Sequence, residues 1–174
     1  MDVIIRPVRV EDAEAIHEMR TRPRCMWGTL QIPSLTVEQV RKQIAEMPDT
    51  MHSFVAEVDG RVVGQISLHT RRGRSAHCAE IGMMVHDDYQ GRGIGTRLME
   101  AIVDLADRWL GLQRLELEVY PDNEPAVRLY RRFGFVEEGR RRAAAWRGGA
   151  FTDTLIMGRL RPGSEAAAQA EGSD

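Results

Sequence analysis

The chain has 174 residues, of which 43% are hydrophobic and 29% charged, and its formal net charge is -2. These values are typical of a soluble globular protein, and the small net charge excludes a general electrostatic affinity for nucleic acid or for a membrane surface. The two cysteines, Cys25 and Cys78, form no Cys-x-x-Cys pair, so we expect neither a metal site nor a disulfide framework. No stretch has the eighteen or so apolar residues of a membrane span and no secretory leader is recognisable, so we expect a cytoplasmic protein.

The first third of the chain predicts a strand followed by two helices. The strand is predicted at residues 3–10 and the helices at residues 11–20 and 36–47. Alternation in the strand predicts that Arg6 and Arg9 point outward, and helical spacing makes His17 a partly buried residue. We expect residues 21–34 to form a loop, because Pro23 and Pro33 interrupt the helical pattern.

The middle of the chain predicts a hairpin and a third strand that leads into a glycine-rich turn. The hairpin strands are predicted at residues 53–58 and 61–70, and the third strand at residues 77–85. Asp59-Gly60 is the strongest local signal for a two-residue hairpin turn. After the glycine-rich turn, apolar residues recur at helical spacing as far as Trp109, and Gly111 is a stop signal.

The last third predicts a strand, a short helix and a second hairpin. The strand is predicted at residues 113–120, the helix at residues 123–134, and the hairpin strands at residues 135–146 and 150–160. Asn123 can cap the short helix, whose apolar face carries Tyr130. Residues 162–174 lack large apolar side chains, so we expect a disordered tail after a single domain at residues 1–161.

The glycine-rich turn at residues 90–96 predicts an anion site at the N-terminus of a helix. The turn reads Gln90-Gly91-Arg92-Gly93-Ile94-Gly95-Thr96. The first amides of a helix lack intrahelical partners and carry partial positive charge, and glycines let a phosphate approach them closely. No lysine follows as in a Walker loop, and the glycine spacing departs from that of the dinucleotide fingerprint, which leaves nicotinamide binding a weak alternative. A purely structural glycine turn is the other reading of this segment alone.

Two motifs in this order resemble those of the GCN5-related N-acetyltransferases (GNAT). Gln90-x-x-Gly93-x-Gly95 after a strand is similar to the family's acetyl-CoA signature. The segment at residues 123–135, Asn-x-x-Ala-x-x-Leu-Tyr-x-x-x-Gly-Phe, is similar to the second family block. The resemblance covers about residues 3–160 and is nearest to the bacterial branch of L-amino acid and phosphinothricin N-acetyltransferases.

The resemblance implies an α/β fold of three layers. In this fold a mixed, mostly antiparallel sheet carries helices on both faces, and its central strand pair is splayed. It also implies acetyl-CoA as co-substrate with no metal, a small-molecule amine as acceptor, and a homodimer, with the final hairpin as a candidate interface. Nucleic-acid and membrane partners are not expected.

The resemblance also assigns site residues. Met84 and Val85 would bind pantetheine and polarise the thioester carbonyl through the backbone, and the turn at residues 90–96 would bind the diphosphate. Asn123 would contact the pantetheine arm, with helix capping as its structural role. Tyr130 would protonate the departing thiolate, with a place in the core as the alternative. Glu80 is our first candidate for the base that deprotonates the amine, with Glu118 or water as alternatives.

The predicted reaction is direct acetyl transfer in a ternary complex, since neither motif contains a cysteine. Trp27, Leu30 and Gln31 would form one wall of the acceptor pocket by resemblance, and a packed loop is their structural alternative. The resemblance to this branch, with Trp27, Leu30, Trp146 and Phe151 as possible walls of the pocket, implies a hydrophobic L-amino acid or an analogue as the acceptor. A protein N-terminal or lysine acetyltransferase and a non-catalytic acyl-CoA-binding regulator are the alternative functions.

Overall fold

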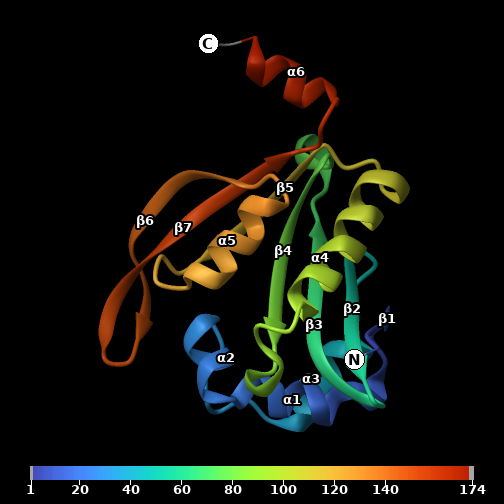
Figure 1. Ribbon diagram of the computed structural model, residues 1–174, viewed down its shortest axis with the longest axis vertical. Coiled ribbons are helices and arrows are strands. Elements are labelled where there is room, and N and C mark those ends of the chain that lie inside the picture. The colour runs from blue at the N-terminus through green and yellow to red at the C-terminus, as the bar shows by residue number, and fades with distance from the viewer. Residues whose placement is uncertain (1, 173–174) are drawn as a thin grey trace. The chain divides into compact units, whose positions relative to one another are not determined.

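The computed structural model describes residues 2–172, and these form two compact units (Figure 1). Unit 1 contains residues 2–68 and 82–102, and unit 2 contains residues 69–81 and 103–172. The prediction of one acetyltransferase domain at residues 1–161 stays a prediction. Residue 1, and residues 173 and 174 of the predicted tail, lie outside the described part.

The hairpin predicted in unit 1 is confirmed. Strands β1 (Ile4–Pro7), β2 (Met51–Val58) and β3 (Arg61–Thr70) occupy this part of the chain. Both residues of the turn between β2 and β3 have positive φ, 50° at Asp59 and 77° at Gly60, as a type I′ turn requires. β1 pairs antiparallel with β2, from Ile4 opposite Glu57 to Pro7 opposite Phe54.

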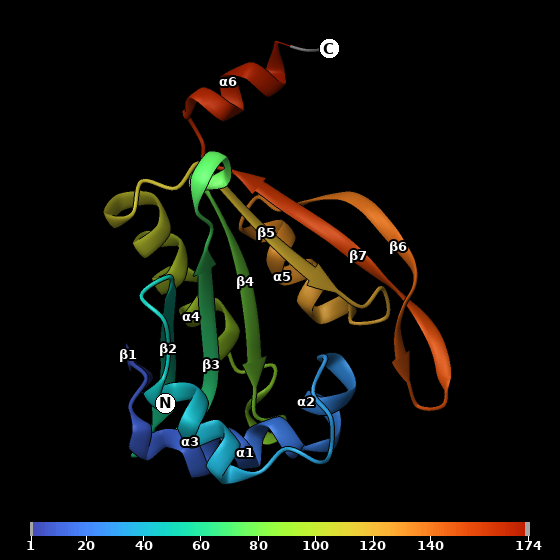
Figure 2. The same ribbon diagram turned by 180° about the vertical axis from the view of Figure 1, so that it is seen from behind.

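Helices cover both faces of the unit 1 strands. They are α1 (Ala13–Thr21), α2 (Pro23–Gly28), α3 (Val37–Ala45) and α4 (Ile94–Asp104), with 3₁₀ turns at Val10–Asp12 and Asp87–Tyr89. One buried cluster joins α1 and α3 to β2 through Ile16, Val40 and Val55. On the other face α4 packs against Gly64 of β3 (Figures 1 and 2). The predicted layers of helix, sheet and helix are therefore present.

Unit 2 contains the remaining strands. These are β5 (Arg114–Val119), β6 (Val136–Arg147), β7 (Ala150–Leu160) and the first part of β4 (Cys78–Val85). The seven strands are ordered β1-β2-β3-β4-β5-β7-β6, and the β4–β5 pair is parallel. Its register runs from Cys78 opposite Arg114 to Glu80 opposite Glu116 and stops there, although β4 continues to Val85. The parallel pairing therefore ends partway along β4.

The helices of unit 2 have clear sequence causes. They are α5 (Glu124–Arg132), α6 (Glu165–Glu171), a 3₁₀ turn at Gly73–Ser75 and a π-helical turn, Leu105–Trp109, that continues α4. Asn123 caps α5 by accepting a hydrogen bond from the amide of Ala126 at 3.4 Å, and Gly134 follows α5 with φ of 86°, as predicted. None of the helices in residues 2–172 has the length and apolarity that crossing a membrane would need.

Four local predictions differ from the structure. Arg6 is not turned to solvent, since it forms ion pairs of 2.8 Å with both Asp12 and Glu57. Trp109 is 77% exposed, because the π-helical turn shifts the helical repeat and rotates its side chain off the buried face. The segment predicted as a loop contains α2, and the segment predicted as a disordered tail contains α6, which Ser164 caps.

Gly64 offers a test of the packing between β3 and α4. A Cβ atom there would lie 2.9 Å from Cδ1 of Leu98 and 3.0 Å from Cγ2 of Ile94. We expect Gly64→Val to lower the free energy of unfolding by about 1–3 kcal/mol, because the helix must move away from the strand. Urea denaturation measures the change. Gly139→Val is the matched control, since nothing lies within 4 Å of its Cβ position. Equal stability of the two variants would contradict this packing.

Candidate active site

The glycine-rich turn presents free backbone amides at the start of α4. Gly91 and Gly93 have φ of 74° and 82°, and nothing lies within 4 Å of the Cβ position of either. The first hydrogen bond of the helix runs from the amide of Arg97 to the carbonyl oxygen of Gly93 at 3.1 Å. The amides of Ile94 and Gly95 therefore precede the first intrahelical hydrogen bond and can receive an anion.

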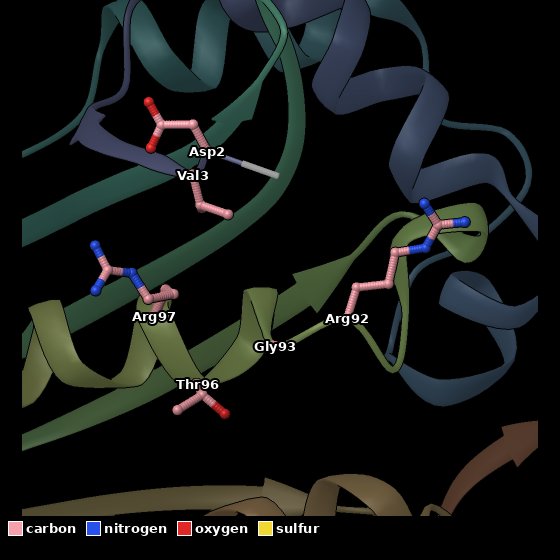
Figure 3. A pocket seen from close by; sticks show the side chains of 6 residues that line it. All are labelled: Asp2, Val3, Arg92, Gly93, Thr96 and Arg97. Atoms are coloured by element: carbon pink, nitrogen blue, oxygen red, sulfur yellow. The ribbon is translucent and has the colours of Figure 1, made fainter.

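Basic side chains lie beside these amides. An open depression is lined by Asp2, Val3, Arg92, Gly93, Thr96 and Arg97. Figure 3 shows Arg92 just before Gly93, and Thr96 and Arg97 in the first turn of α4. The guanidinium of Arg92 lies 5.5 Å from the ring centre of Tyr89. Two cations next to a helix N-terminus favour a phosphorylated ligand.

Gln90 braces the approach to the turn. Its Nε2 donates a hydrogen bond of 3.1 Å to the carbonyl oxygen of Val85, which ties the turn to the end of β4. Met84 and Val85 are half-buried, and Met84 packs against the core cluster of α1 and α3. The structure thus brings Met84, Val85 and residues 90–96 together within unit 1. Gln90 therefore also has a structural role, its hydrogen bond to Val85, which the motif alone does not reveal.

Asp87 anchors α2 to the segment that follows β4. Its carboxylate is buried and accepts hydrogen bonds from the amides of Arg24 at 2.9 Å and Cys25 at 2.8 Å. Nη2 of Arg24 in turn donates to the carbonyl oxygen of Asp87 at 2.9 Å. Sequence analysis missed this contact. The one local signal was an acidic residue between a strand and the glycine turn, and nothing in it indicates a partner 62 positions away.

Trp27, Leu30 and Gln31 lie on α2 or just after it. Trp27 and Leu30 are 53% and 64% exposed. The amide of Gln31 donates to Oγ1 of Thr29 at 3.4 Å. Through Asp87 this segment is held next to the end of β4. The proposed wall is therefore an exposed surface of unit 1.

Cys25 is the cysteine near this surface, and its buried thiol is unreactive. Burial, with a smaller contribution from Asp87, raises the pKa of its thiol to about 12. A protonated, buried thiol is a poor nucleophile. This agrees with the prediction of direct transfer without an acyl-enzyme.

The candidate acid, Tyr130, is in unit 2. It lies on the buried face of α5 with its ring centre 6.0 Å from that of Phe135, and burial raises the pKa of its phenol to about 12. Within residues 2–172 no group hydrogen-bonds its hydroxyl. Tyr130 therefore keeps its proton at neutral pH, and its hydroxyl is available to donate.

The two candidate bases differ in their surroundings. Glu118 accepts hydrogen bonds from Thr154 and, at 3.0 Å, from Arg141. Glu80 is exposed in β4 and makes no hydrogen bond or ion pair within the described residues. A carboxylate that already accepts two hydrogen bonds is less free to approach an ammonium, so Glu80 is the better candidate of the two.

Two further observations concern the aromatic side chains of the β6–β7 hairpin in unit 2 and the side chains that could bind a metal. Trp146 and Phe151 contact each other edge to face at 4.8 Å between ring centres, and both are exposed on the β6–β7 hairpin. Across residues 2–172, no three His, Cys, Asp or Glu side chains are grouped as a metal site would require.

Comparison with known proteins gives consistent matches. Residues 14–135 match the model of the "Acetyltransferase (GNAT) family". The L-amino acid N-acetyltransferase AaaT of Escherichia coli is 32% identical over 92% of this chain and 99% of its own. An acetyltransferase of the GNAT family from Streptococcus pneumoniae superposes with a TM-score of 0.80 at 26% identity, covering 91% of this chain and 99% of that one. Spermidine N-acetyltransferase from Vibrio cholerae, solved with CoA and spermine, shares the fold with a TM-score of 0.81 at 23% identity, over 91% and 95%.

The buried carboxylate of Asp87 can be tested directly. We expect Asp87→Ala to lower the free energy of unfolding by about 2–4 kcal/mol, because two buried amides lose a charged acceptor. Hydrogen exchange at Arg24 and Cys25 should accelerate with it. Asp88→Ala is the control, since Asp88 is 64% exposed and meets Arg22 only at 3.7 Å. Unchanged exchange at these amides in Asp87→Ala would show that α2 does not depend on the carboxylate.

Proposed function

The chain belongs to the acetyltransferase (GNAT) family, and from this premise we propose that it transfers the acetyl group of acetyl-CoA to the amine of a hydrophobic L-amino acid or a close analogue. The observation that carries the donor half is the start of α4. There the unobstructed amides after Gly93 and the cations Arg92 and Arg97 suit the diphosphate of the coenzyme. The similarity to AaaT over nearly the whole of both chains supports the acceptor half.

We propose that the backbone at Met84 and Val85 binds the pantetheine arm and polarises the thioester carbonyl. A hydrogen-bond donor fixed in advance stabilises the oxyanion that develops as the amine attacks. Gln90 supports this role, because it holds the Val85 carbonyl and so fixes the strand end. Asn123 is proposed to hold the same arm from the start of α5, in addition to capping that helix.

The proton transfers are assigned to two residues. Glu80, directly or through water, takes a proton from the acceptor ammonium. The free amine then attacks the thioester carbon, the C–S bond breaks, and Tyr130 gives its proton to the CoA thiolate. The acetylated nitrogen loses its extra proton, which returns through water to the Tyr130 phenolate. The products are the N-acetylated acceptor and CoA thiol. The absence of a competing ion pair at Glu80 supports the first assignment, and the retained proton of Tyr130 supports the second.

Thiol release from acetyl-CoA, measured with a panel of acceptors, tests the proposal. The panel contains L-methionine, L-phenylalanine, spermidine and short peptides. We expect release with the two amino acids and little with the others. Release with spermidine or a peptide alone would move the acceptor to a polyamine or a protein N-terminus. No release despite acetyl-CoA binding would favour a non-catalytic regulator.

Replacement of Tyr130 tests its role as the acid. We expect Tyr130→Phe to lower kcat about 100-fold, because general acid catalysis contributes roughly that much, while acetyl-CoA affinity changes little. Steady-state kinetics and calorimetry give the two values. Tyr120→Phe is the control, since Tyr120 is also buried in unit 2. A kcat in Tyr130→Phe equal to that of the control would assign Tyr130 to the core alone.

A further inference from the structure

Arg20, the last basic residue of α1, is a half-buried cation with only neutral partners among the described residues. Its Nη1 donates to Oε1 of Gln43 at 2.8 Å, and its Nη2 donates to Oε1 of Gln65 at 3.3 Å. Its Nε is fully buried and has no hydrogen-bond partner. Burial lowers the pKa of the guanidinium below its usual value, because the charged form loses water.

Three other buried or half-buried arginines of the described chain are paired with carboxylates. Arg6 meets Asp12 at 2.8 Å, Arg114 meets Glu116 at 2.7 Å, and Arg159 meets Asp107 at 2.7 Å. A buried charge is costly unless an opposite charge accompanies it. Arg161 in unit 2 also lacks a carboxylate partner and donates to the carbonyl oxygen of Asp107 at 3.2 Å. Among the described residues of unit 1, Arg20 is the half-buried arginine that carries this cost without a carboxylate, which is the situation of a cation that serves a ligand.

A buried polar network holds the guanidinium in place. Gln65, which accepts from Arg20, is only 3% exposed, and its own Nε2 donates to Oγ of Ser53 at 3.0 Å. Ser67 donates to the same Ser53 oxygen at 3.2 Å. Because Gln65 is fixed by Ser53, its Oε1 orients Arg20, and the two amide contacts leave three of the five N–H donors of the guanidinium without a protein acceptor.

Strand register places this network beside an open part of the sheet. The amide of His86 in β4 bonds to the carbonyl oxygen of Val63 in β3 at 2.9 Å. Antiparallel pairing from this bond sets Gln65 opposite Met84 and Ser67 opposite Gly82, with each pair on one face. Gly82 is exposed, and nothing lies within 4 Å of its Cβ position. Met84, on the same face, packs against the core of α1, so this face is also the one that carries Arg20.

We propose that Arg20 binds the α-carboxylate of the acceptor, whose amine-bearing carbon lies on the open surface over Gly82. This inference rests on the proposed function, because it concerns the acceptor of that reaction. It defines the substrate class by chemistry: a molecule with a carboxylate next to its primary amine. Polyamines have no carboxylate, and a peptide has its carboxylate far from its terminal amine.

Two acceptors that differ only at the carboxylate test the proposal. L-methionine has the carboxylate and L-methioninamide does not. We expect Arg20→Gln to lower kcat/KM for L-methionine about 10- to 100-fold, as loss of a charged hydrogen bond does, and to change kcat/KM for L-methioninamide less than about threefold. Because each variant is compared with wild type on the same acceptor, the different amine pKa values of the two acceptors cancel. Arg20→Lys should recover part of the loss, since it restores the charge.

Control measurements separate this effect from unfolding. Arg41→Gln removes an exposed arginine of α3, whose contact with Glu14 is 3.7 Å long, and should leave both acceptors unaffected. The melting temperature and acetyl-CoA affinity of Arg20→Gln should stay near those of wild type, because the substitution removes a desolvated charge. Equal losses on L-methionine and L-methioninamide, or no loss on either, would overturn the role of Arg20.

A binding measurement distinguishes failure of this inference from failure of the proposed function. If wild-type protein acetylates neither acceptor, the proposed reaction fails, and calorimetry with L-methionine then decides the role of Arg20 alone. Binding by wild type that Arg20→Gln weakens about tenfold or more would keep the carboxylate site. Binding that is equal in both proteins, or absent from both, would remove it.

Discussion

The carboxylate of Asp87 is the interaction on which the arrangement of unit 1 depends most. It lies between β4 and the glycine-rich turn, and it accepts the amides of Arg24 and Cys25 at the start of α2. A six-residue helix has too few internal hydrogen bonds to be stable alone, so α2 exists because a tertiary contact satisfies its first amides. One buried carboxylate thereby fixes a surface segment against the strand that leads to the glycine-rich turn.

The distribution of charge explains a second feature of unit 1. Where a guanidinium is buried for structural reasons, as at Arg6, a carboxylate comes with it and its ion pairs join separate elements. Arg20 is likewise held by hydrogen bonds to Gln43 and Gln65, but neither of these partners is charged. Evolution of a stable core would favour a carboxylate or an apolar residue at such a position. An unneutralised cation there does not favour folding, which is why we infer that it serves binding.

Much of the fold follows from signals that are local in sequence. The hairpin at Asp59-Gly60, the cap at Asn123 and the stop at Gly134 are each set by residues within a few positions, so sequence analysis found them. The glycine turn was found for the same reason, since its chemistry is that of one helix end. The features that sequence analysis missed have non-local or subtle causes. The first amides of α2 are satisfied by Asp87, which is distant in sequence. The exposure of Trp109 depends on one π-helical turn, which the spacing of apolar residues does not reveal. Arg20 was missed because its significance lies in the partners it lacks, which only three-dimensional packing defines.

The two glutamates show how structure refines an assignment that sequence leaves open. Glu80 and Glu118 occupy similar positions in alternating strands, so residue type and spacing cannot rank them as bases. Packing distinguishes them, because the carboxylate of Glu118 is already engaged in hydrogen bonds from Arg141 and Thr154. Glu80 has no such partner within residues 2–172, and only water competes for its lone pairs. A base must be free to approach the acceptor ammonium, and this is the geometric reason why we propose Glu80 rather than Glu118 for that role.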